Sequence, residues 1–464
     1  LGLTGNLVEG ANLYFRSAPF PGRVARVVLP RPQSTLVDRV PADALNCPMT
    51  TDARGAPRPV NVSGLPAALC DVGAVESSGS EYIPQTTVVN IYDVDLPDAT
   101  TCNAFCDADE QLPGNQCTLR AAVMENSCHW LWLQPWTTDI LIPEPGVTIP
   151  LTLTKPGGEA DELRYGAGAN TAATRIRGGE VVGEQRPLIV ASHGGRILVV
   201  NTGILELANL RMTGGYGQAT SFTDPSGGAI AGIGMDSLYL RNMELFGNQA
   251  EERGGAIWSD IAEVFLEKVS IHDNAAVADG SAIQITGGAL TIVDSSIYNN
   301  TVLDPVGMRG AVLLDASGAG TAGDLFVVNS TISSNNGSGI ALLNLGTHSV
   351  TIAIDASTLS HNARYGIVEE GSGEPGDKLL MARHSIFSNN LLGSCRVDFP
   401  AYFDYDMVGF NISQDSNCEM TGGTNLIGVD PLLGVLSTPS YATAFRPLLP
   451  GSPAIDGGSS DPAA

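Results

Sequence analysis

Hydrophobic positions recur along the middle of the chain in a fixed phrase. An apolar residue is followed by another two positions later and a third seven positions later, and an asparagine stands ten positions after the first. The seven copies begin at Leu205, Leu238, Val264, Leu290, Leu325, Ile352 and Leu379. Apolar residues that alternate in this way have the period of a β-strand, and Gly, Asn, Asp and Ser interrupt them. The pattern predicts short strands, and it disfavours helices, over residues 201–392.

The asparagines that end the phrase form a column of six. They are Asn248, Asn274, Asn300, Asn335, Asn362 and Asn389, at steps of 26, 26, 35, 27 and 27 residues, and the first copy has Gly215 instead. A second phrase, such as Gly254-Gly255-Ala256-Ile257, lies between successive copies of the first. Each repeat therefore contains at least two short strands.

A unit of this size cannot bury its own apolar face, so the units must stack on one another. Stacking at the strand spacing of roughly 4.8 Å gives a continuous apolar column, and seven copies extend roughly 34 Å. The predicted fold class is all-β, a right-handed parallel β-helix whose coils follow the 26- and 27-residue steps. Asparagine tolerates the left-handed backbone of a tight turn, and its amide can bond to the same residue of the next coil. We therefore predict that the six asparagines form a structural ladder.

The composition supports a turn-rich β-protein and limits its partners. The 464 residues include 54 Gly and 28 Pro. The 49 acidic and 24 basic residues give a net charge of -25 without a basic cluster, so nucleic acid and anionic membranes are disfavoured partners. We expect no cofactor, with Ca2+ as the one alternative that this charge favours. No run approaches eighteen apolar residues, so no membrane span is predicted, and we expect that a segment was removed ahead of Leu1.

Eight cysteines lie outside the repeats. An even number near loops, without a CxxC phrase or the Cys/His spacing of a zinc site, predicts four disulfides in an oxidising compartment. By neighbourhood the expected pairs are Cys47 with Cys70, Cys395 with Cys418 and, among three possible pairings of the middle four, Cys106 with Cys117 and Cys102 with Cys128. These bonds predict disulfide-bonded caps at the two ends of the solenoid.

Two phrases outside the repeats resemble a known family. The segment Cys117-Thr-Leu-Arg-Ala-Ala resembles the CSLREA motif, which opens many bacterial secreted β-helix proteins. Its own residues predict a short amphipathic helix with Leu119, Ala122 and Val123 on one face, suited to cap the open apolar end of a β-helix. Near the other end, Ser452-Pro-Ala-Ile-Asp-Gly-Gly resembles the SPAIDxG phrase of the choice-of-anchor Q domain. The resemblance implies a secreted protein with repeats like those of polymorphic outer-membrane proteins.

The end of such a domain stands at the front of this chain. In the family, SPAIDxG is followed by a Cys, a TDxRGxxRP phrase and a closing CDIGAxE, whereas this chain ends shortly after SPAIDxG. The two missing phrases match residues Asp52, Arg54, Gly55, Arg58, Asp71 and Gly73. The resemblance divides the chain into the tail of an anchor Q domain (1–78), a CSLREA-type cap with the first coils (79–200), regular repeats (201–392) and C-terminal coils with the SPAIDxG phrase (393–464).

This order of segments suggests an assembly. A β-helix whose last coil lacks its finishing segment exposes backbone groups and apolar side chains at that end. The N-terminal segment of another copy can cover them, and a heterologous contact that does not close produces a filament. We predict a secreted or cell-surface structural protein whose partner is itself, in a head-to-tail homopolymer. The alternatives are that residues 1–76 act on their own chain, in a monomeric adhesin or glycan-binding module, or that the chain is one unit of a tandem protein.

Catalysis is the third possibility, because parallel β-helices often cleave acidic polysaccharides. Such an enzyme needs carboxylates gathered on neighbouring coils, or a calcium cluster with a basic residue. The acidic residues of the repeats do not share a register, and no nucleophile elbow, Walker phrase or metal-binding His pair is present. The chain is therefore predicted not to be a lyase or hydrolase. Phe246, His272 and Tyr298 occupy one position of consecutive repeats and are predicted to stack, an arrangement that can also hold a sugar.

Overall fold

The computed structural model describes residues 85–88 and 117–458, apart from 129–137, 155–160, 167–172, 180–184, 220–223, 261–262, 305–308, 317–322, 344–349, 371–377, 399–402, 408, 421–422 and 440–442, and ahead of them only the backbone of four strands. The chain divides into two compact units, Leu1–Pro84 and Gln85–Ala464. In the first unit β1 (Phe15–Ala18) pairs antiparallel with β2 (Val27–Pro30), and β3 (Val40–Pro41) with β4 (Leu69–Cys70).

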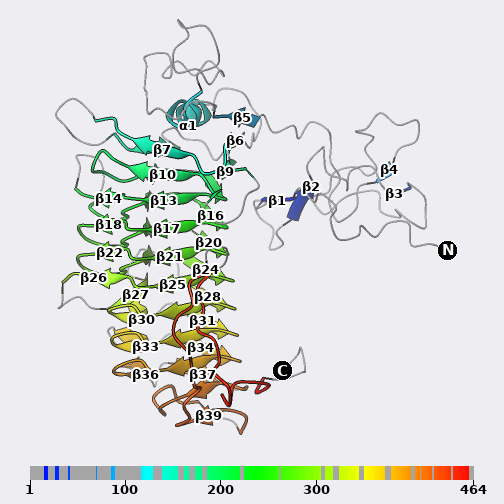
Figure 1. Cartoon of the computed structure of the whole chain (residues 1–464), viewed down its shortest axis with the longest axis vertical. Coiled ribbons are helices and arrows are strands. Elements are labelled where there is room, and N and C mark those ends of the chain that lie inside the picture. The colour runs from blue at the N-terminus through cyan, green and yellow to red at the C-terminus, as the bar shows by residue number, and fades with distance from the viewer. Residues whose placement is uncertain are drawn as a thin grey trace, which may run out of the picture. The chain divides into compact units, whose positions relative to one another are not determined.

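The second unit is a stack of coils whose strands form three long parallel sheets (Figure 1). The first sheet contains β7 (Thr148–Leu151), β10 (Leu188–Ala191), β13 (Arg211–Thr213), β17 (Glu244–Phe246), β21 (Ser270–His272), β25 (Ser296–Tyr298), β29 (Thr331–Ser333), β32 (Thr358–Ser360), β35 (Ile386–Ser388), β38 (Ile412–Ser413) and β39 (Leu426–Ile427). The second contains β8 (Leu163–Tyr165), β11 (Leu198–Val200), β15 (Ile230–Gly232), β19 (Ile257–Asp260), β23 (Ile283–Thr286), β27 (Gly310–Asp315), β30 (Ser338–Leu343), β33 (Tyr365–Glu370) and β36 (Gly393–Val397). The third contains β5 (Gln85–Thr87), β6 (Thr138–Ile142), β9 (Ala173–Gly178), β12 (Ile204–Ala208), β16 (Ser237–Arg241), β20 (Glu263–Glu267), β24 (Ala289–Val293), β28 (Leu325–Val328), β31 (Val350–Asp355), β34 (Lys378–Arg383) and β37 (Phe403–Asp406).

Two smaller elements complete the stack. A four-stranded parallel sheet contains β14 (Tyr216–Gly217), β18 (Gln249–Ala250), β22 (Ala275–Ala276) and β26 (Thr301–Val302). The helix α1 (Leu119–Cys128) packs against β6 and β8 at the N-terminal end of the coils. Its residues Leu119, Ala122 and Val123 are buried in the main apolar core, so the helix caps that end of the solenoid.

The apolar phrase of the sequence lies on the inner side of the third sheet. Leu205, Leu238, Val264 and Leu290 are register partners in β12, β16, β20 and β24, and all four are buried. This stacking confirms the predicted all-β parallel β-helix. The predicted bond between Cys395 and Cys418 is also present, with 4.8 Å between the Cα atoms.

The predicted register is wrong in the last repeat. Ile352 pairs with Leu380, and Leu359 pairs with Phe387, so the inward residues lie one position later than the sequence phrase placed them. The coil is one residue longer than expected, and consecutive apolar residues at this point made two registers look equivalent. The structure adopts the register that buries the side chain of Phe387 completely. Asn389 is consequently exposed in the left-handed conformation, at φ 54°, and does not belong to the ladder.

The asparagine ladder lies between the first sheet and the four-stranded sheet. Each ladder amide accepts from the backbone N–H and the side-chain Nδ2 of the residue one coil earlier, at about 3.0 Å, and its own Nδ2 donates to backbone carbonyls. The column runs through Asn248, Asn274, Asn300, Asn335, Asn362 and, in place of Asn389, Asn390. All but Asn390 are buried, which supports a structural role.

A second ladder joins the third sheet to the first. Its members are Ser295, Ser330, Ser357, Ser385, Asn411 and Asn425, and each accepts from the backbone N–H of the equivalent residue one coil earlier. The sequence phrase did not predict it. Both ladders provide hydrogen-bond partners for buried backbone groups at the turns, which the sheets leave unpaired. These hydrogen bonds fix the register of the coils.

Candidate functional site: an axial groove beside the C-terminal arm

After β39 the chain reverses and runs back along the first sheet as an arm, described at residues 431–439 and 443–449, whose two halves are joined by antiparallel bridges (Figure 1). The amide of Ala444 donates to the hydroxyl of Ser296 at 3.0 Å. Nearer the C-terminal coils, Nε of Arg446 donates to the hydroxyl of Ser333 at 2.8 Å. The arm is therefore anchored to the coils of β25 and β29.

Small side chains make room for the arm. Beneath the described part of the arm, the outward positions of the first sheet are Ser296 and Tyr298 in β25, Thr331 and Ser333 in β29, and Thr358 and Ser360 in β32. On the preceding coils the same positions hold Arg211, Thr213, Glu244, Phe246, Ser270 and His272, several of which are larger.

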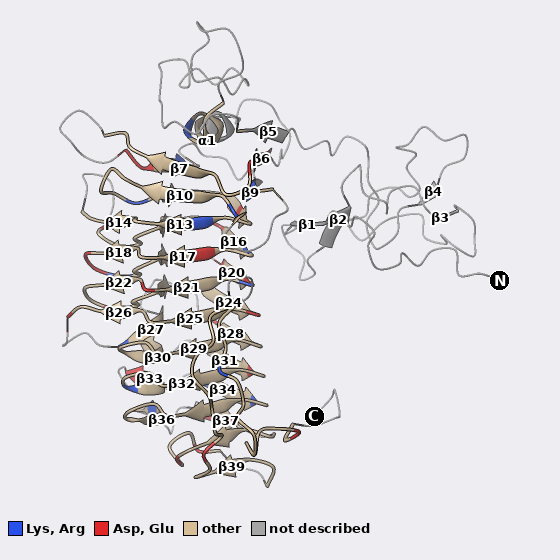
Figure 2. Cartoon of the chain, in the orientation of Figure 1, with Lys and Arg blue, Asp and Glu red and all other residues tan. Residues whose placement is uncertain are grey.

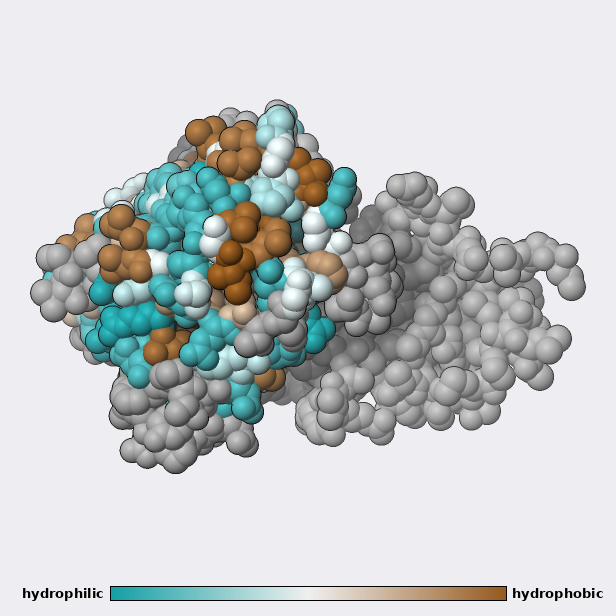
Figure 3. Space-filling model, turned by 90° about the horizontal axis from the view of Figure 1, so that it is seen from below, coloured by the Kyte–Doolittle hydropathy of each residue, from teal (hydrophilic) through white to brown (hydrophobic). Residues whose placement is uncertain are grey.

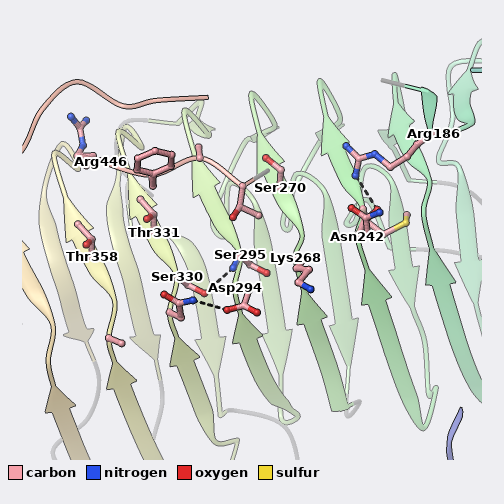
Figure 4. Close-up of a pocket in the computed structure, with 16 residues that line it drawn as sticks. Arg186, Asn242, Lys268, Ser270, Asp294, Ser295, Ser330, Thr331, Thr358 and Arg446 are labelled. Carbon is pink, nitrogen blue, oxygen red and sulfur yellow. Dashed lines mark hydrogen bonds between the residues drawn. The ribbon is translucent and has the colours of Figure 1, made fainter. Parts of the chain in front are cut away.

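A groove of about 670 Å³ lies beside the arm (Figure 4). Its floor includes one turn residue from each of five coils, namely Asn242, Lys268, Asp294, Asn329 and Ala356. All five have left-handed backbone, with φ between 45° and 55°, so the turn repeats with one geometry. Because successive coils are roughly 4.8 Å apart, the floor extends roughly 19 Å along the solenoid axis.

A smaller pocket of about 270 Å³ continues the groove toward the C-terminal end. It includes Ala356, His384 and Phe410, which are the next members of the same turn column, and the His384 and Phe410 rings stack with centroids 5.8 Å apart. Arg446 lines both pockets. The arm thus borders both pockets, and Arg446 lies where they adjoin.

Three cations line the groove, Arg186, Lys268 and Arg446. Within the described part of the chain, neither Lys268 nor Arg446 forms a salt bridge, and Arg446 donates only to the hydroxyls of Ser333 and Ser334 and to the carbonyl of Gly434. Burial lowers the pKa of Arg446. The groove's acidic residue, Asp294, accepts from the side-chain amide of Asn329 at 2.7 Å.

An ionic cluster adjoins the N-terminal end of the groove, where the basic β13 and the acidic β17 are neighbours (Figure 2). Glu244 accepts from Arg211 at 2.6 Å, from His272 at 3.1 Å and from Arg186 at 3.4 Å. The other ring nitrogen of His272 bonds to Asp273 at 2.7 Å. Burial opposes ionisation of Glu244, but hydrogen bonds from His272 and Arg211 and their charges lower its pKa to about 2.

Burial also opposes the charge of His272, and hydrogen bonds with Glu244 and Asp273 outweigh it, so the pKa of His272 is raised. The His272 ring stacks between Phe246, at 5.6 Å, and Tyr298, at 4.8 Å between centroids. Arg211 covers the Phe246 ring at 5.2 Å. The three rings that the sequence placed in one column therefore form a continuous stack, whose central ring bonds to the carboxylates of Glu244 and Asp273.

The low pKa of Glu244 predicts a specific loss of stability in acid. The pKa of Glu244 is about 2 in the folded protein and 4.5 in the unfolded chain. The ionised carboxylate therefore stabilises the fold above pH 4.5, and this stabilisation disappears as the pH falls toward 2. We expect Glu244→Gln to lose less free energy of unfolding than the wild type between those two pH values, measured by urea titration at each. Glu144→Gln, at an exposed turn, is the control and should behave as the wild type. Equal losses in all three proteins would contradict this role of Glu244.

The remaining predicted residues are placed as follows. Cys117 is disulfide-bonded. Cys47, Cys102, Cys106, Asp52, Arg54, Gly55, Arg58, Asp71 and Gly73 lie outside the described residues, and of Cys70 and Cys128 only the backbone is described. Their pairings and their role in subunit contact stay predictions. In the part of the chain that the structure describes, no group of three His, Cys, Asp or Glu residues is placed to hold a metal, and no helix is long and apolar enough to cross a membrane.

Sequence reasoning missed Lys268 and Arg446. A signal for Lys268 was available, since the turn residue stands six positions before each ladder asparagine in the first repeats, as Lys268 does before Asn274. Nothing in the sequence placed Arg446 beside it, because the arm contacts coils that precede it by more than 100 residues in the chain.

Three comparisons with known proteins bear on this fold. A family model described as the right handed beta helix region matches residues 191–424. A solved structure of a periplasmic alginate epimerase is similar over 59% of this chain and 78% of its own, at 12% sequence identity and a TM-score of 0.20. That score is too low to support an argument about activity. Among curated proteins, none matches the sequence.

Proposed function

This chain belongs to the right-handed beta helix family, and on that premise we propose that it is an extracellular structural subunit that joins copies of itself head to tail. The observation behind the proposal is the difference between the two ends of the solenoid. At the N-terminal end α1 buries Leu119, Ala122 and Val123 against the first coils. At the C-terminal end no comparable helix is present among the described residues, which makes that end the natural site of a contact.

The C-terminal end has both features of a joining surface. The strands β36, β37 and β39 are the last of their sheets, so each has a partner on one side only within the described residues. Leu426 and Ile427 of β39 are exposed, as are Leu432 and Val435 just after it. Viewed from below, hydrophobic patches lie on this end among hydrophilic residues (Figure 3). An open strand edge with apolar side chains favours pairing with another chain.

A second copy is the partner that the sequence supports. Residues 1–78 resemble the segment that finishes an anchor Q domain, and in this chain they stand ahead of the SPAIDxG phrase. If this segment completes the C-terminal end of another copy, the contact joins different surfaces and can repeat without closing. A monomeric adhesin with a glycan-binding groove is the second candidate function. Catalysis is the third candidate.

Charges placed on β39 test the assembly. We expect the wild type to form end-to-end chains in negative-stain microscopy and a concentration-dependent mass in ultracentrifugation. The double substitution Leu426→Lys/Ile427→Lys should leave single solenoids, because it places two charges at the joining edge. Leu303→Lys, at a residue 48% exposed in a mid-solenoid turn, is the control and should assemble as the wild type does.

Cross-linking distinguishes the two roles of the N-terminal segment. In a mixture of isotopically labelled and unlabelled copies, links between residues 1–78 and the C-terminal end should join one labelled and one unlabelled chain. Links confined to single copies would contradict assembly through this segment, as would a wild type that stays monomeric at every concentration.

A further inference from the structure

We infer that the antiparallel pair β1–β2 of one copy binds the C-terminal end of the next copy, and that arginines in and beside this pair meet carboxylates at that end. This inference rests on the proposed head-to-tail function, and it names the element and the charges that make the contact. β1 and β2 lie within residues 10–37, here called the arginine stretch. The C-terminal end consists of β37, β39 and the residues that follow each of them.

Two copies of the solenoid repel each other unless cations lie at their joint. Residues 79–464 contain 43 acidic and 17 basic residues, so both facing ends belong to strongly anionic bodies. At physiological salt the screening length is about 8 Å, and the charges at the joint itself therefore decide how strong the repulsion is. A head-to-tail contact between such bodies needs a cationic segment from one of the partners.

The arginine stretch can supply these cations. It contains Arg16, Arg23, Arg26 and Arg31 and neither Asp nor Glu, and no other stretch of the chain that lacks acidic residues contains as many basic ones. The strand β2 reads Val-Val-Leu-Pro and has one arginine immediately before it and one immediately after it. Among the described residues β1 and β2 pair only with each other, so each has an edge left for a further strand. The stretch therefore offers an apolar strand and permanent positive charges to one surface.

The C-terminal end has carboxylates that lack a cation. Asp404, Glu419, Asp430 and Asp456 are exposed, and none of them forms a salt bridge with a described residue. Burial and the nearby charge of Glu419 raise the pKa of Tyr405 in β37 to about 12, so Glu419 lies close to that strand. Acidic residues are visible around β37 and β39 in Figure 2. This end is therefore able to accept a cationic partner.

These carboxylates lie beside an apolar centre. Asp430 closely follows the exposed Leu426 and Ile427 of β39, and Leu426 lines the smaller pocket together with Gly457, which comes directly after Asp456. An apolar centre with a charged rim is typical of specific interfaces, in which the centre provides affinity and the rim charges direct the encounter. An apolar strand with an arginine at each end is complementary to such a surface, because guanidinium groups bind carboxylates with two parallel hydrogen bonds.

Reversing the charges on either side tests the contact. Arg26→Glu/Arg31→Glu changes the donor segment, and Asp404→Lys/Glu419→Lys changes the acceptor end. We expect each variant alone to need at least a tenfold higher concentration than the wild type to assemble, because like charges then meet at every joint. An equal mixture of the two variants should assemble again into alternating chains, since every joint between unlike copies pairs opposite charges. Sedimentation velocity on the full chains measures both effects.

Two further measurements separate charge at the joint from charge in general. Asp236→Lys/Glu251→Lys makes the same change of charge at exposed residues of the middle coils, and it should assemble as the wild type does. Raising the salt concentration from about 0.05 M to about 0.5 M should weaken assembly of the wild type at least tenfold, because salt screens the exposed ion pairs.

A mixture that assembles no better than either variant alone would overturn this inference, and so would a wild type whose assembly does not respond to salt. Head-to-tail joining would then stand, with another segment making the contact. A wild type that stays monomeric at every concentration would overturn the proposed function and this inference together, so the two failures are distinguishable. Misfolding does not imitate the expected result, because mixing would not restore assembly of two misfolded variants.

Discussion

Replacing Asn300 with alanine is expected to lower the free energy of unfolding by about 3 to 5 kcal/mol. The Asn300 amide is fully buried and forms five hydrogen-bond contacts, of which Nδ2 shares its two hydrogens among three acceptors. Its oxygen accepts from the N–H and Nδ2 of Asn274 at 3.0 Å, and its Nδ2 donates to the carbonyls of Ile271 and Tyr298 and to Asn335. Alanine leaves these buried groups without partners on both sides, and each lost partner exacts the desolvation cost of a buried polar group.

The neighbouring residue offers a matched control. Asn299 is exposed and has left-handed backbone, at φ 55°, so Asn299→Gly removes an amide without straining the turn. It should change the free energy of unfolding by less than about 1 kcal/mol. Urea denaturation followed by circular dichroism measures both variants. A cost for Asn300→Ala no larger than that of Asn299→Gly would show that the ladder contributes little.

Hydrogen exchange should show where the effect lies. Because each coil of a solenoid contacts only its neighbours, the loss at Asn300 should appear as faster exchange in β21, β25 and β29, while α1 keeps its protection. The register at the end of the ladder can be tested in the same way. Asn390→Ala should lower the free energy of unfolding more than Asn389→Ala does, because Asn390 belongs to the ladder and Asn389 does not.

Much of the fold could be predicted from the sequence because the same pattern of apolar residues and asparagines recurs in successive coils of the β-helix. The period of alternation gave the strands, and the spacing of the asparagines gave the coil length. The prediction for Asn389 was wrong because the preceding strand contains the consecutive apolar residues Leu379, Leu380 and Met381, which do not alternate with a period of two. Only the packing of Phe387 against the previous coil decides the register there, and a single strand does not contain that information.

The groove could not be predicted because it depends on a contact between distant segments. The arm crosses coils that precede it by more than 100 residues, as the bond from Arg446 to Ser333 shows. Its seat is a run of serines and threonines, which in sequence looks like ordinary surface. The ring stack, by contrast, was predictable, since Phe246, His272 and Tyr298 share one repeat position.

Arg196 is expected to be the most sensitive charged residue of the first coils. Its side chain is fully buried, and Nη1 donates to the equally buried Glu162 at 2.9 Å. It also donates to the carbonyls of Ser226, at 2.8 Å, and Asp224. Burial lowers the pKa of Arg196 and Glu162 opposes that change. One guanidinium thus joins β8, the start of β11 and the loop before β15, next to the cap formed by α1.

Arg196→Met should destabilise the protein by about 3 to 5 kcal/mol, because among the described residues it leaves the buried Glu162 in an ion pair with the partly exposed Arg164 alone, at 3.3 Å. Adding Glu162→Leu removes the uncompensated charge, so the double variant should be more stable than Arg196→Met by at least about 1 kcal/mol. It should remain below the wild type, since the carbonyls of Ser226 and Asp224 still lack their donor. Urea titration of the single and double variants measures this coupling. Strictly additive losses would mean that Arg196 acts through those carbonyls alone, and that the buried ion pair adds nothing to the N-terminal coils.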